Sequence, residues 1–360
     1  MRYPDFLNEN GRVGFIAPSF GCTTEPYRTL FEQAIKFFND RGYQTVLGPN
    51  CFKEDGVGKS TSPDACGAEI NDFFGHDKCD IIISCGGGEL MCEDLPYVDF
   101  DALMNAKPKW YMGFSDNTNL IFLLNTICDT AAIYGPNAPK FGTNPMHKCV
   151  TDSFEVLTGK RKSVSNYDGW YLEDAYPIEE AADERTDSFD EEMEKTYVEK
   201  SYTIVPYEQT VCYGQNSCDE VSFKGRLIGG CMDCLVNLCG TTFDRVSDFL
   251  EKYKEDGIIW YLEACDLNVM GIRRALWQME NAGWFKYITG FIIGRPMHID
   301  DTFGDFDRIE AVRGILGKYN VPIVMDIDLG HLFPMMPIVS GAMAEVTAED
   351  NNIRIDYDFI

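Results

Sequence analysis

A serine that follows a short apolar run is the first candidate for chemistry in this sequence. The apolar run 110–112 stops at Gly113, and Ser115 comes two residues later. Capping residue types after the serine and apolar spacing over 120–127 predict a helix. Strand, tight turn, serine and helix make up a nucleophile elbow, which exposes the serine hydroxyl at a strand end. The second glycine of G-x-S-x-G is absent, and a serine before a helix is commonly only an N-cap, so this motif alone does not establish catalysis.

A serine nucleophile needs a base that titrates near neutral pH, and histidine is the natural choice. The four histidines are His76, His147, His298 and His331. The first lies in a polar turn at the predicted sheet edge opposite the serine, and the second precedes a segment of shifted composition. The last two both follow predicted strands, and spacing leaves both open. Glu263 ends another strand and could orient an imidazole, although such carboxylates more often form ion pairs or caps.

Strands and helices alternate along most of the chain, which predicts α/β architecture with a mostly parallel sheet and right-handed crossovers. In the first half we expect strands at 12–19, 43–47, 80–84 and 110–112, with helices at 27–39 and 63–74. In the second half we expect strands at 257–263, 291–294 and 322–326, helices at 272–284 and 308–319, and a hairpin from 343–346 and 353–357. The length suggests about two domains, which we place at 1–147 and 221–360, with a linker or insertion at 148–220.

The loops after strand ends bind ligands in such folds, and two candidates occupy them. Gly86, Gly87 and Gly88 follow one strand, and Ser115 follows the next. Consecutive glycines allow backbone N–H groups to approach a ligand closely, although a simple turn would also use them. The G-x-G-x-x-G pattern of dinucleotide sites is missing here, which argues against NAD.

Composition excludes several classes of partner. The formal charge is -27 and the pI about 4.4, so nucleic acid and anionic membrane surfaces are not expected partners. The chain starts without a secretory pattern and has no apolar run of about 20 residues. We therefore expect a cytoplasmic protein with reduced thiols among its 14 cysteines. Cys231 and Cys234 have no second pair or nearby histidine, so we interpret them as buried thiols and expect no metal or organic cofactor.

The interior segment 148–220 differs in composition from its surroundings. Its residues 187–194 form an acidic run that predicts a solvated surface. Aromatic residues stand in a polar setting at 167–171, with Trp170 at their centre. This segment is interpreted as a cover or linker between the domains.

Several short motifs, taken in order, resemble the LD-carboxypeptidase serine peptidase family, including its microcin C immunity branch. They extend from about residue 12 to 346, and each is short while the ordered set is specific. They are Ile16-Ala17-Pro18-Ser19, Ser84-Cys85-Gly86-Gly87-Gly88, Leu95-Pro96-Tyr97-Val98-Asp99, Gly113-Phe114-Ser115-Asp116-Asn117-Thr118, Tyr134-Gly135-Pro136, Gly225-Arg226-Leu227-Ile228-Gly229-Gly230, Leu262-Glu263 and Gly330-His331 with Pro334 and Pro337.

The resemblance implies a catalytic triad with Ser115 as nucleophile, His331 as base and Glu263 as the carboxylate that orients it. It also implies an oxyanion hole of backbone amides, which we place at Asp116 and the Gly87-Gly88 loop. The fold it implies is a doubly wound N-terminal domain with a smaller, β-rich C-terminal domain, in a homodimer.

Two departures from the family pattern bear on the substrate. The first glycine loop of cell-wall enzymes usually carries Arg-Gly-Gly-Tyr-Gly, which is absent here, and the segment 148–220 is longer than in compact members. Both resemble the immunity branch, in which aromatics stack on a nucleotide. Trp170 is the candidate for that contact, and packing of its ring within the loop is the alternative.

We therefore expect a serine carboxypeptidase that hydrolyses an aminoacyl-nucleotide amide. The alternatives are a murein tetrapeptide LD-carboxypeptidase of cell-wall recycling and, in a different class, a non-catalytic ligand-binding protein.

Overall fold

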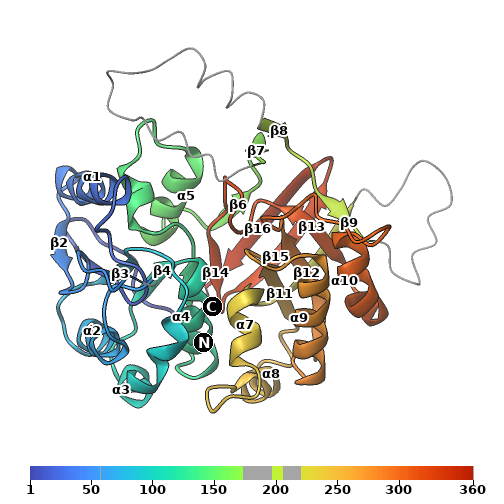
Figure 1. The fold of residues 1–360 in the computed structure, drawn as a ribbon, viewed down its shortest axis with the longest axis horizontal. Coiled ribbons are helices and arrows are strands. Elements are labelled where there is room, and N and C mark those ends of the chain that lie inside the picture. Colours follow the sequence, from blue (N-terminus) through green and yellow to red (C-terminus); the bar gives the residue numbers. More distant parts are fainter. Residues whose placement is uncertain (57, 173–196, 206–219, 360) are drawn as a thin grey trace. The chain divides into compact units, whose positions relative to one another are not determined.

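The chain forms two compact units in its computed structural model, which describes residues 1–56, 58–172, 197–205 and 220–359 (Figure 1). The first unit comprises Met1–Arg161 and Pro337–Ser340. The second comprises the described residues of Lys162–Tyr176, Asp190–Met336 and Gly341–Ile360. The predicted acidic surface at 187–194 and most of the predicted insertion lie outside the described residues.

A six-stranded sheet forms the centre of the first unit, in the order β14-β5-β4-β3-β1-β2. All neighbours are parallel except β14, which runs antiparallel to β5. The central strands are fully buried, as expected for a sheet covered on both faces. The strands are β1 (Arg12–Ile16), β2 (Gln44–Leu47), β3 (Ile81–Ser84), β4 (Trp110–Gly113), β5 (Ala132–Tyr134) and β14 (Ile338–Ser340).

Helices cover both faces of this sheet (Figure 1). One face carries α1 (Tyr27–Asp40) and α5 (Lys148–Leu157), joined by an edge contact between the rings of Phe37 and Phe154. The other carries α2 (Pro63–Gly75), α3 (Phe100–Asn105) and α4 (Thr118–Thr126). Because the connections leave β1 in one direction and β3 in the other, the strand order reverses between these two strands. Ligands bind at such a reversal, beyond the carboxyl ends of the strands.

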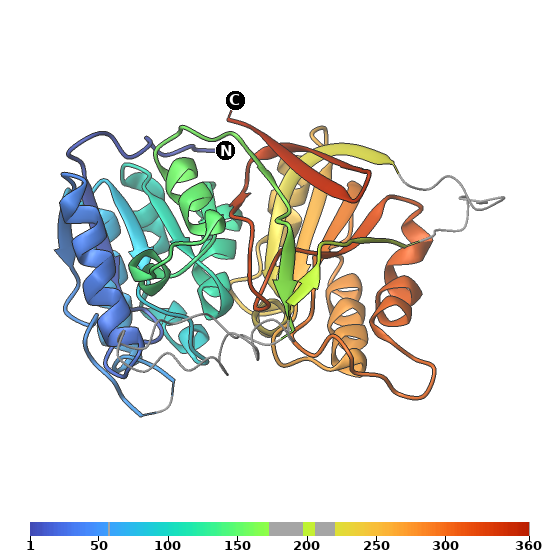
Figure 2. The same cartoon turned by 90° about the horizontal axis from the view of Figure 1, so that it is seen from above.

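The second unit is built on an eight-stranded sheet in the order β6-β16-β15-β10-β11-β12-β13-β9, whose four central strands β10 to β13 are parallel. Helices α7, α8, α9 and α10 connect them on one face (Figure 2). The strands are β6 (Ser163–Ser165), β9 (Thr203–Ile204), β10 (Val221–Cys231), β11 (Ile258–Glu263), β12 (Ile288–Gly294), β13 (Ile323–Ile327), β15 (Met343–Glu349) and β16 (Asn352–Asp358). The helices are α7 (Met232–Leu238), α8 (Val246–Lys252), α9 (Val269–Asn281) and α10 (Arg308–Leu316). A separate pair joins β7 (Gly169–Tyr171) to β8 (Tyr197–Glu199).

The structure confirms the α/β class, with a parallel sheet in the N-terminal unit and a separate β-rich C-terminal unit. The predicted final hairpin is also present, since β15 pairs antiparallel with β16. The sequence analysis did not anticipate β10, in which Gly225, Gly229 and Gly230 interrupt the apolar pattern. It also did not anticipate the short strands β5 and β14, nor β6 to β9, which have three residues or fewer and are too short for apolar alternation to show.

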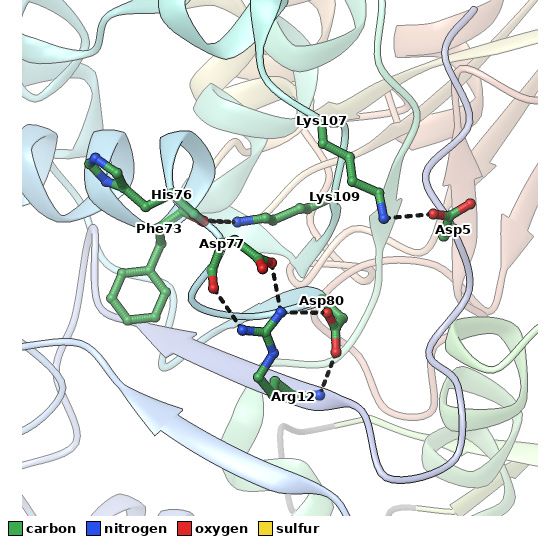
Figure 3. Close-up of polar contacts among 8 residues, drawn as sticks. All are labelled: Asp5, Arg12, Phe73, His76, Asp77, Asp80, Lys107 and Lys109. Carbon is green, nitrogen blue, oxygen red and sulfur yellow. Dashed lines mark hydrogen bonds and ion pairs between the residues drawn. The ribbon is translucent and has the colours of Figure 1, made fainter.

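Charged side chains gather at the amino edge of the first sheet, where β1, β3 and β4 begin (Figure 3). The guanidinium of Arg12 binds Asp77 and Asp80. The ammonium of Lys109 is buried and donates to the main-chain oxygens of Phe73 and His76, each at 2.5 Å. Lys109 therefore satisfies carbonyls at the C-terminal end of α2, where a cation is favoured.

Replacing Lys109 tests this contact. Lys109→Met should lower the free energy of unfolding by about 2 kcal/mol, because charge-assisted bonds to two main-chain carbonyls are lost. The control is Lys107→Met, which removes an ion pair with Asp5 whose side chains are 74% and 75% exposed. That change should cost at most about 0.5 kcal/mol. Urea denaturation followed by fluorescence measures both, and equal losses would contradict the assignment.

Candidate active site

Ser115 lies at the carboxyl end of β4, in a short 3-10 turn that leads into α4. Its backbone has φ 63°, in the left-handed region that a serine seldom adopts. The amide N–H of Ser115 donates to the hydroxyl of Tyr134 at the end of β5, at 3.1 Å. The predicted order of strand, tight turn, serine and helix is therefore confirmed, and the strained φ is typical of functional turns.

The glycine loop after β3 packs directly against this serine. A Cβ atom at Gly87 would lie 3.0 Å from Cβ and 3.2 Å from Oγ of Ser115. Gly88 has φ 150°, and a Cβ there would lie 2.1 Å from Oγ of Ser19. Gly88 therefore excludes a larger residue and Gly87 leaves little room for one, and the backbone of this loop lies beside the serine side chain.

A buried polar network fixes the serine turn. The amide of Asn117 donates to the main-chain oxygen of Gly86 at 2.8 Å, and its Oδ1 accepts the hydroxyl of Tyr111. The carboxylate of Asp116 accepts the Ser19 hydroxyl and the N–H of Met91. The Asp116 side chain thus points into the protein, which leaves its backbone N–H as the group relevant to an oxyanion.

The sequence analysis gave no role to three polar residues of this network: Ser19 and Tyr134, which stand in the motifs that carry the resemblance, and Asn137. The side chain of Asn137 accepts the N–H of Phe114 at 3.3 Å. Ser19 follows β1, Tyr134 ends β5 and Asn137 follows β5, and both strands belong to the first sheet. The signal that could have found them is their position at the carboxyl edge, because their residue types are common.

Glu263 and His331 meet in the second unit. Glu263 ends β11 and is 0% exposed. Oε2 of Glu263 lies 2.9 Å from Nδ1 of His331, in the loop after β13. A carboxylate at this distance accepts a proton held on Nδ1, which leaves Nε2 as the basic nitrogen of the neutral ring. The two residues predicted to form the base and its orienting acid are thus brought together.

Gly330 makes this contact sterically feasible. Its φ is 104°, and a Cβ there would lie 2.8 Å from Oε2 of Glu263. The backbone before His331 therefore approaches the carboxylate as closely as only glycine allows.

The environment of His331 favours its protonated form. Burial by itself lowers the pKa of the imidazole, but the Glu263 carboxylate and a hydrogen bond with Cys265 raise that pKa well above its usual value. Because its pKa is raised, His331 becomes neutral, and so able to accept a proton, only at higher pH. We therefore expect it to act as a base at alkaline pH.

The other histidines lie elsewhere. His298, left open by spacing, is exposed at the loop after β12, and His76 is exposed at the end of α2. His147 caps α5, where its ring nitrogen accepts the N–H of Cys149 at 3.1 Å. Of the two candidates, His331 is the one in contact with Glu263.

Trp170 lies in β7 and is 5% exposed. The guanidinium of Arg295 stands over its ring, 4.7 Å from the centroid. The guanidinium covers one face of the indole and little of the ring is exposed, so stacking on a ligand would require the opposite face to be uncovered. The structure thus places Ser115, Gly87, Gly88 and Asp116 in the first unit and Glu263, His331 and Trp170 in the second.

The described residues contain neither a metal-ligand cluster nor a membrane-spanning helix. No group of three or more histidine, cysteine, aspartate or glutamate side chains there is arranged to hold a metal ion. Cys231 is buried and Cys234 partly buried. Within the described part of the chain, none of the helices has the length and apolar character needed to cross a bilayer.

Two family models match this sequence. The LD-carboxypeptidase N-terminal domain matches residues 13–135, and the LD-carboxypeptidase C-terminal domain matches residues 224–346. Together they cover more than half of the chain. Ser115 lies within the first match, and Glu263 and His331 lie within the second.

Relatives and solved structures agree with these matches. The microcin C7 self-immunity protein MccF of Escherichia coli is 23% identical, over 97% of this chain and 94% of its own length. A putative carboxypeptidase of Vibrio cholerae is 22% identical, over 99% and 98%. MccF in complex with aspartyl sulfamoyl adenosine superposes with a TM-score of 0.76 at 20% identity, covering 99% of both chains. An MccF-like protein from Streptococcus pneumoniae in complex with AMP gives 0.72 at 23%, covering 96% of this chain and 99% of its own. At these identities the superpositions establish a shared fold.

The contact between Glu263 and His331 predicts how stability depends on pH. A folded-state pKa raised above the unfolded value near 6.5 gives stability that is complete below about pH 6.5 and is lost as the pH rises through the folded-state pKa. Glu263→Gln should therefore lower the free energy of unfolding by about 3 kcal/mol at about pH 5.5 and by clearly less at about pH 9.5. Urea denaturation at both pH values measures this, and a difference that grows with pH would contradict it.

Proposed function

This chain belongs to the LD-carboxypeptidase family, and from that premise we propose that it is a serine carboxypeptidase whose triad is Ser115, His331 and Glu263. The observation that carries the proposal is the 2.9 Å contact between Nδ1 of His331 and the buried carboxylate of Glu263. A buried carboxylate that holds one imidazole nitrogen is the arrangement by which hydrolases prepare the other nitrogen as a base.

The first chemical step is attack by Ser115. Nε2 of His331 takes the hydroxyl proton while Oγ of Ser115 bonds to the carbonyl carbon of the scissile amide. The carbonyl oxygen becomes an oxyanion, which the backbone N–H groups of Asp116 and the Gly87-Gly88 loop stabilise. Each such donor typically lowers the activation barrier by about 3 kcal/mol.

The second half of the reaction reverses the proton's path. His331 gives its proton to the nitrogen of the leaving amine, and the carbon–nitrogen bond breaks to leave an ester on Ser115. Water then attacks this ester with His331 again as base, and the serine is regenerated. Glu263 stays ionised throughout and stabilises the imidazolium that forms in each half. Such a cycle uses no metal or organic cofactor.

Chain connectivity supports the proposal that the serine and the histidine act together. Only the stretch 332–337 separates His331 from β14, which pairs with β5 in the first sheet. Strand β5 in turn pairs with β4, the strand that leads into Ser115.

An aminoacyl nucleotide is the substrate class we propose. The scissile bond is the amide that joins an amino acid to a sulfamoyl or phosphoramidate adenylate, and its cleavage would detoxify a microcin C-like compound. Likeness to solved proteins that hold aspartyl sulfamoyl adenosine or AMP supports this choice, as does the missing Arg-Gly-Gly-Tyr-Gly loop. We retain Trp170 as the candidate for stacking on the base.

Murein tetrapeptide cleavage is the second candidate. It is favoured by the family models, which are those of LD-carboxypeptidases, and by curated relatives described as putative carboxypeptidases. The same triad would then release a terminal D-alanine. A homodimer and a cytoplasmic location are predicted from the resemblance and the composition, and both stay predictions.

Removing the nucleophile tests the activity. Ser115→Ala should reduce hydrolysis of aspartyl sulfamoyl adenosine by about 10³-fold or more, because the residual rate rests on binding and the oxyanion hole alone. Ser153→Ala removes another buried hydroxyl of the same unit, on α5, and should leave the rate unchanged. Release of free aspartate, measured by chromatography, reports the rate.

Three outcomes of this assay would redirect the proposal. Undiminished turnover by Ser115→Ala would refute the nucleophile. Release of D-alanine from a murein tetrapeptide without cleavage of the nucleotide would establish the second candidate. Tight binding of the nucleotide by wild type without any hydrolysis would identify a binding protein instead.

The pKa of His331 predicts the pH dependence of hydrolysis. The imidazolium cannot accept a proton, so kcat/KM should rise as the pH increases through a pKa above the usual value for histidine. Glu263→Gln removes the carboxylate that raises this pKa, so the rise should move to lower pH while the maximum falls. Values of kcat/KM measured in a series of buffers test both effects. If kcat/KM rose at the same pH in both proteins, this would argue against His331 as the base.

A further inference from the structure

The loop that carries His331 is closed at its base. It begins at Asp328, directly after β13, and the main-chain oxygen of Asp328 accepts the N–H of Met336 at 2.7 Å. His331 lies inside this closed segment, 328–336. Whatever fixes the segment therefore fixes where the imidazole stands.

A buried ion pair anchors the first residue of the segment. Oδ1 of Asp328 lies 2.5 Å from a guanidinium nitrogen of Arg295, and both side chains are 1% exposed. Arg295 directly follows β12, the strand beside β13. Replacing such pairs by apolar residues often leaves stability unchanged or improves it, so a pair of this kind is better explained by the geometry it imposes than by net stability.

The second oxygen of Asp328 binds the segment 167–171. Oδ2 accepts the N–H of Tyr167 at 2.6 Å. Further along, the N–H of Tyr171 donates to the main-chain oxygen of Phe333 at 3.0 Å, and the two rings stack with centroids 6.2 Å apart. The segment thus holds the His331 loop on both sides of the histidine.

Arg295 makes two further contacts, with Trp170 and with Ser201. Its guanidinium lies over the ring of Trp170, and a second nitrogen donates to the main-chain oxygen of Ser201 at 3.3 Å. Arg295 therefore touches the His331 loop and the strand β7 at once.

We propose that Arg295 and Asp328 are positioning residues for His331, which couple its loop to the segment 167–171 and hold its imidazole against Glu263. The proposal deepens the function proposed above and rests on it for its kinetic effect. Neither residue touches the substrate in this scheme. Their role is to keep the ring where Nδ1 meets the carboxylate and Nε2 stays available.

A second ion pair, whose aspartate lies two residues before Asp328, offers a control. Asp326 of β13 binds Arg308 through two contacts, at 2.8 and 2.9 Å, and Asp326 is also buried. Asp326 also accepts the hydroxyl of Thr203 of β9 at 2.7 Å. This pair resembles the first in type and lies close to it in the sequence, although Arg308 is 25% exposed, and it binds α10 and β9 instead of the His331 loop.

The test compares two double variants, Arg295→Met/Asp328→Asn and Arg308→Met/Asp326→Asn. Each removes one charge of either sign, so the net charge near His331 does not change. Rates are measured with aspartyl sulfamoyl adenosine, and the four imidazoles of the full chain are titrated by NMR. Arg295→Lys is the second variant, which keeps the charge and loses the planar fork, in case the first double variant does not fold.

We expect Arg295→Met/Asp328→Asn to lower kcat by about 10- to 100-fold with KM changed by less than about threefold, because a displaced base slows chemistry more than binding. The pKa of His331 should fall toward its ordinary value, which reports loss of the Glu263 contact since the charges cancel. Arg295→Lys should lie between this variant and wild type. The control pair should leave kcat within about threefold and the pKa of His331 unchanged.

Equal effects of the two double variants, or an unchanged His331 pKa in the first, would overturn the positioning role. The titration does not depend on catalysis. If wild type hydrolyses none of the substrates, the proposed function fails, while the His331 pKa in the variants still decides whether Arg295 and Asp328 hold the ring.

Discussion

The structure around the candidate base depends on the buried carboxylate of Glu263. A fully buried charge is costly unless it is compensated by hydrogen bonds or an opposite charge, and here the compensating partner is His331. Bringing it close requires glycine at 330, where a Cβ would lie 2.8 Å from Oε2 of Glu263. At Gly294 a Cβ would lie 2.0 Å from the main-chain oxygen of Leu329, so the backbone at the end of β12 closely approaches the His331 loop. The glutamate at the end of β11 is thus packed against the loop after β13, and its carboxylate raises the pKa of the His331 imidazole although burial of the ring lowers it.

Much of the fold was predictable because apolar periodicity is strong in most of the long elements, although the eleven-residue strand β10 was not anticipated. The strands around 80–84, 110–112 and 257–263 and the helix from Tyr27 were found within a few residues of their observed bounds. The short strands β5 and β14 were not, since three residues give no period. Strand β14 also pairs with a strand some two hundred positions earlier, and that register depends on long-range contacts that local pattern does not encode.

The residues of the candidate site were likewise predicted in part from the sequence and in part recognised only in the structure. Ser115 and Gly87 were found because they follow strands, and parallel strands present such loops at one edge. For the base, residue type and spacing left His298 and His331 open, and resemblance to a family, followed by the observed contact with Glu263, distinguished them. Ser19 and Tyr134 carry common hydroxyls, so their place in the serine turn emerged only from the folded chain. Arg295 was passed over because a single arginine after a strand carries no distinctive pattern.

The interleaved course of the chain has an evolutionary consequence. The first sheet takes its edge strand from 337–340, while the second sheet takes β6 from the stretch just after α5. Exchange of the C-terminal half for that of another protein would thus strip a strand from the N-terminal half and leave β5 as a bare edge prone to aggregation. The two halves are therefore poorly suited to domain shuffling, and the topology favours inheritance of the gene as one undivided unit.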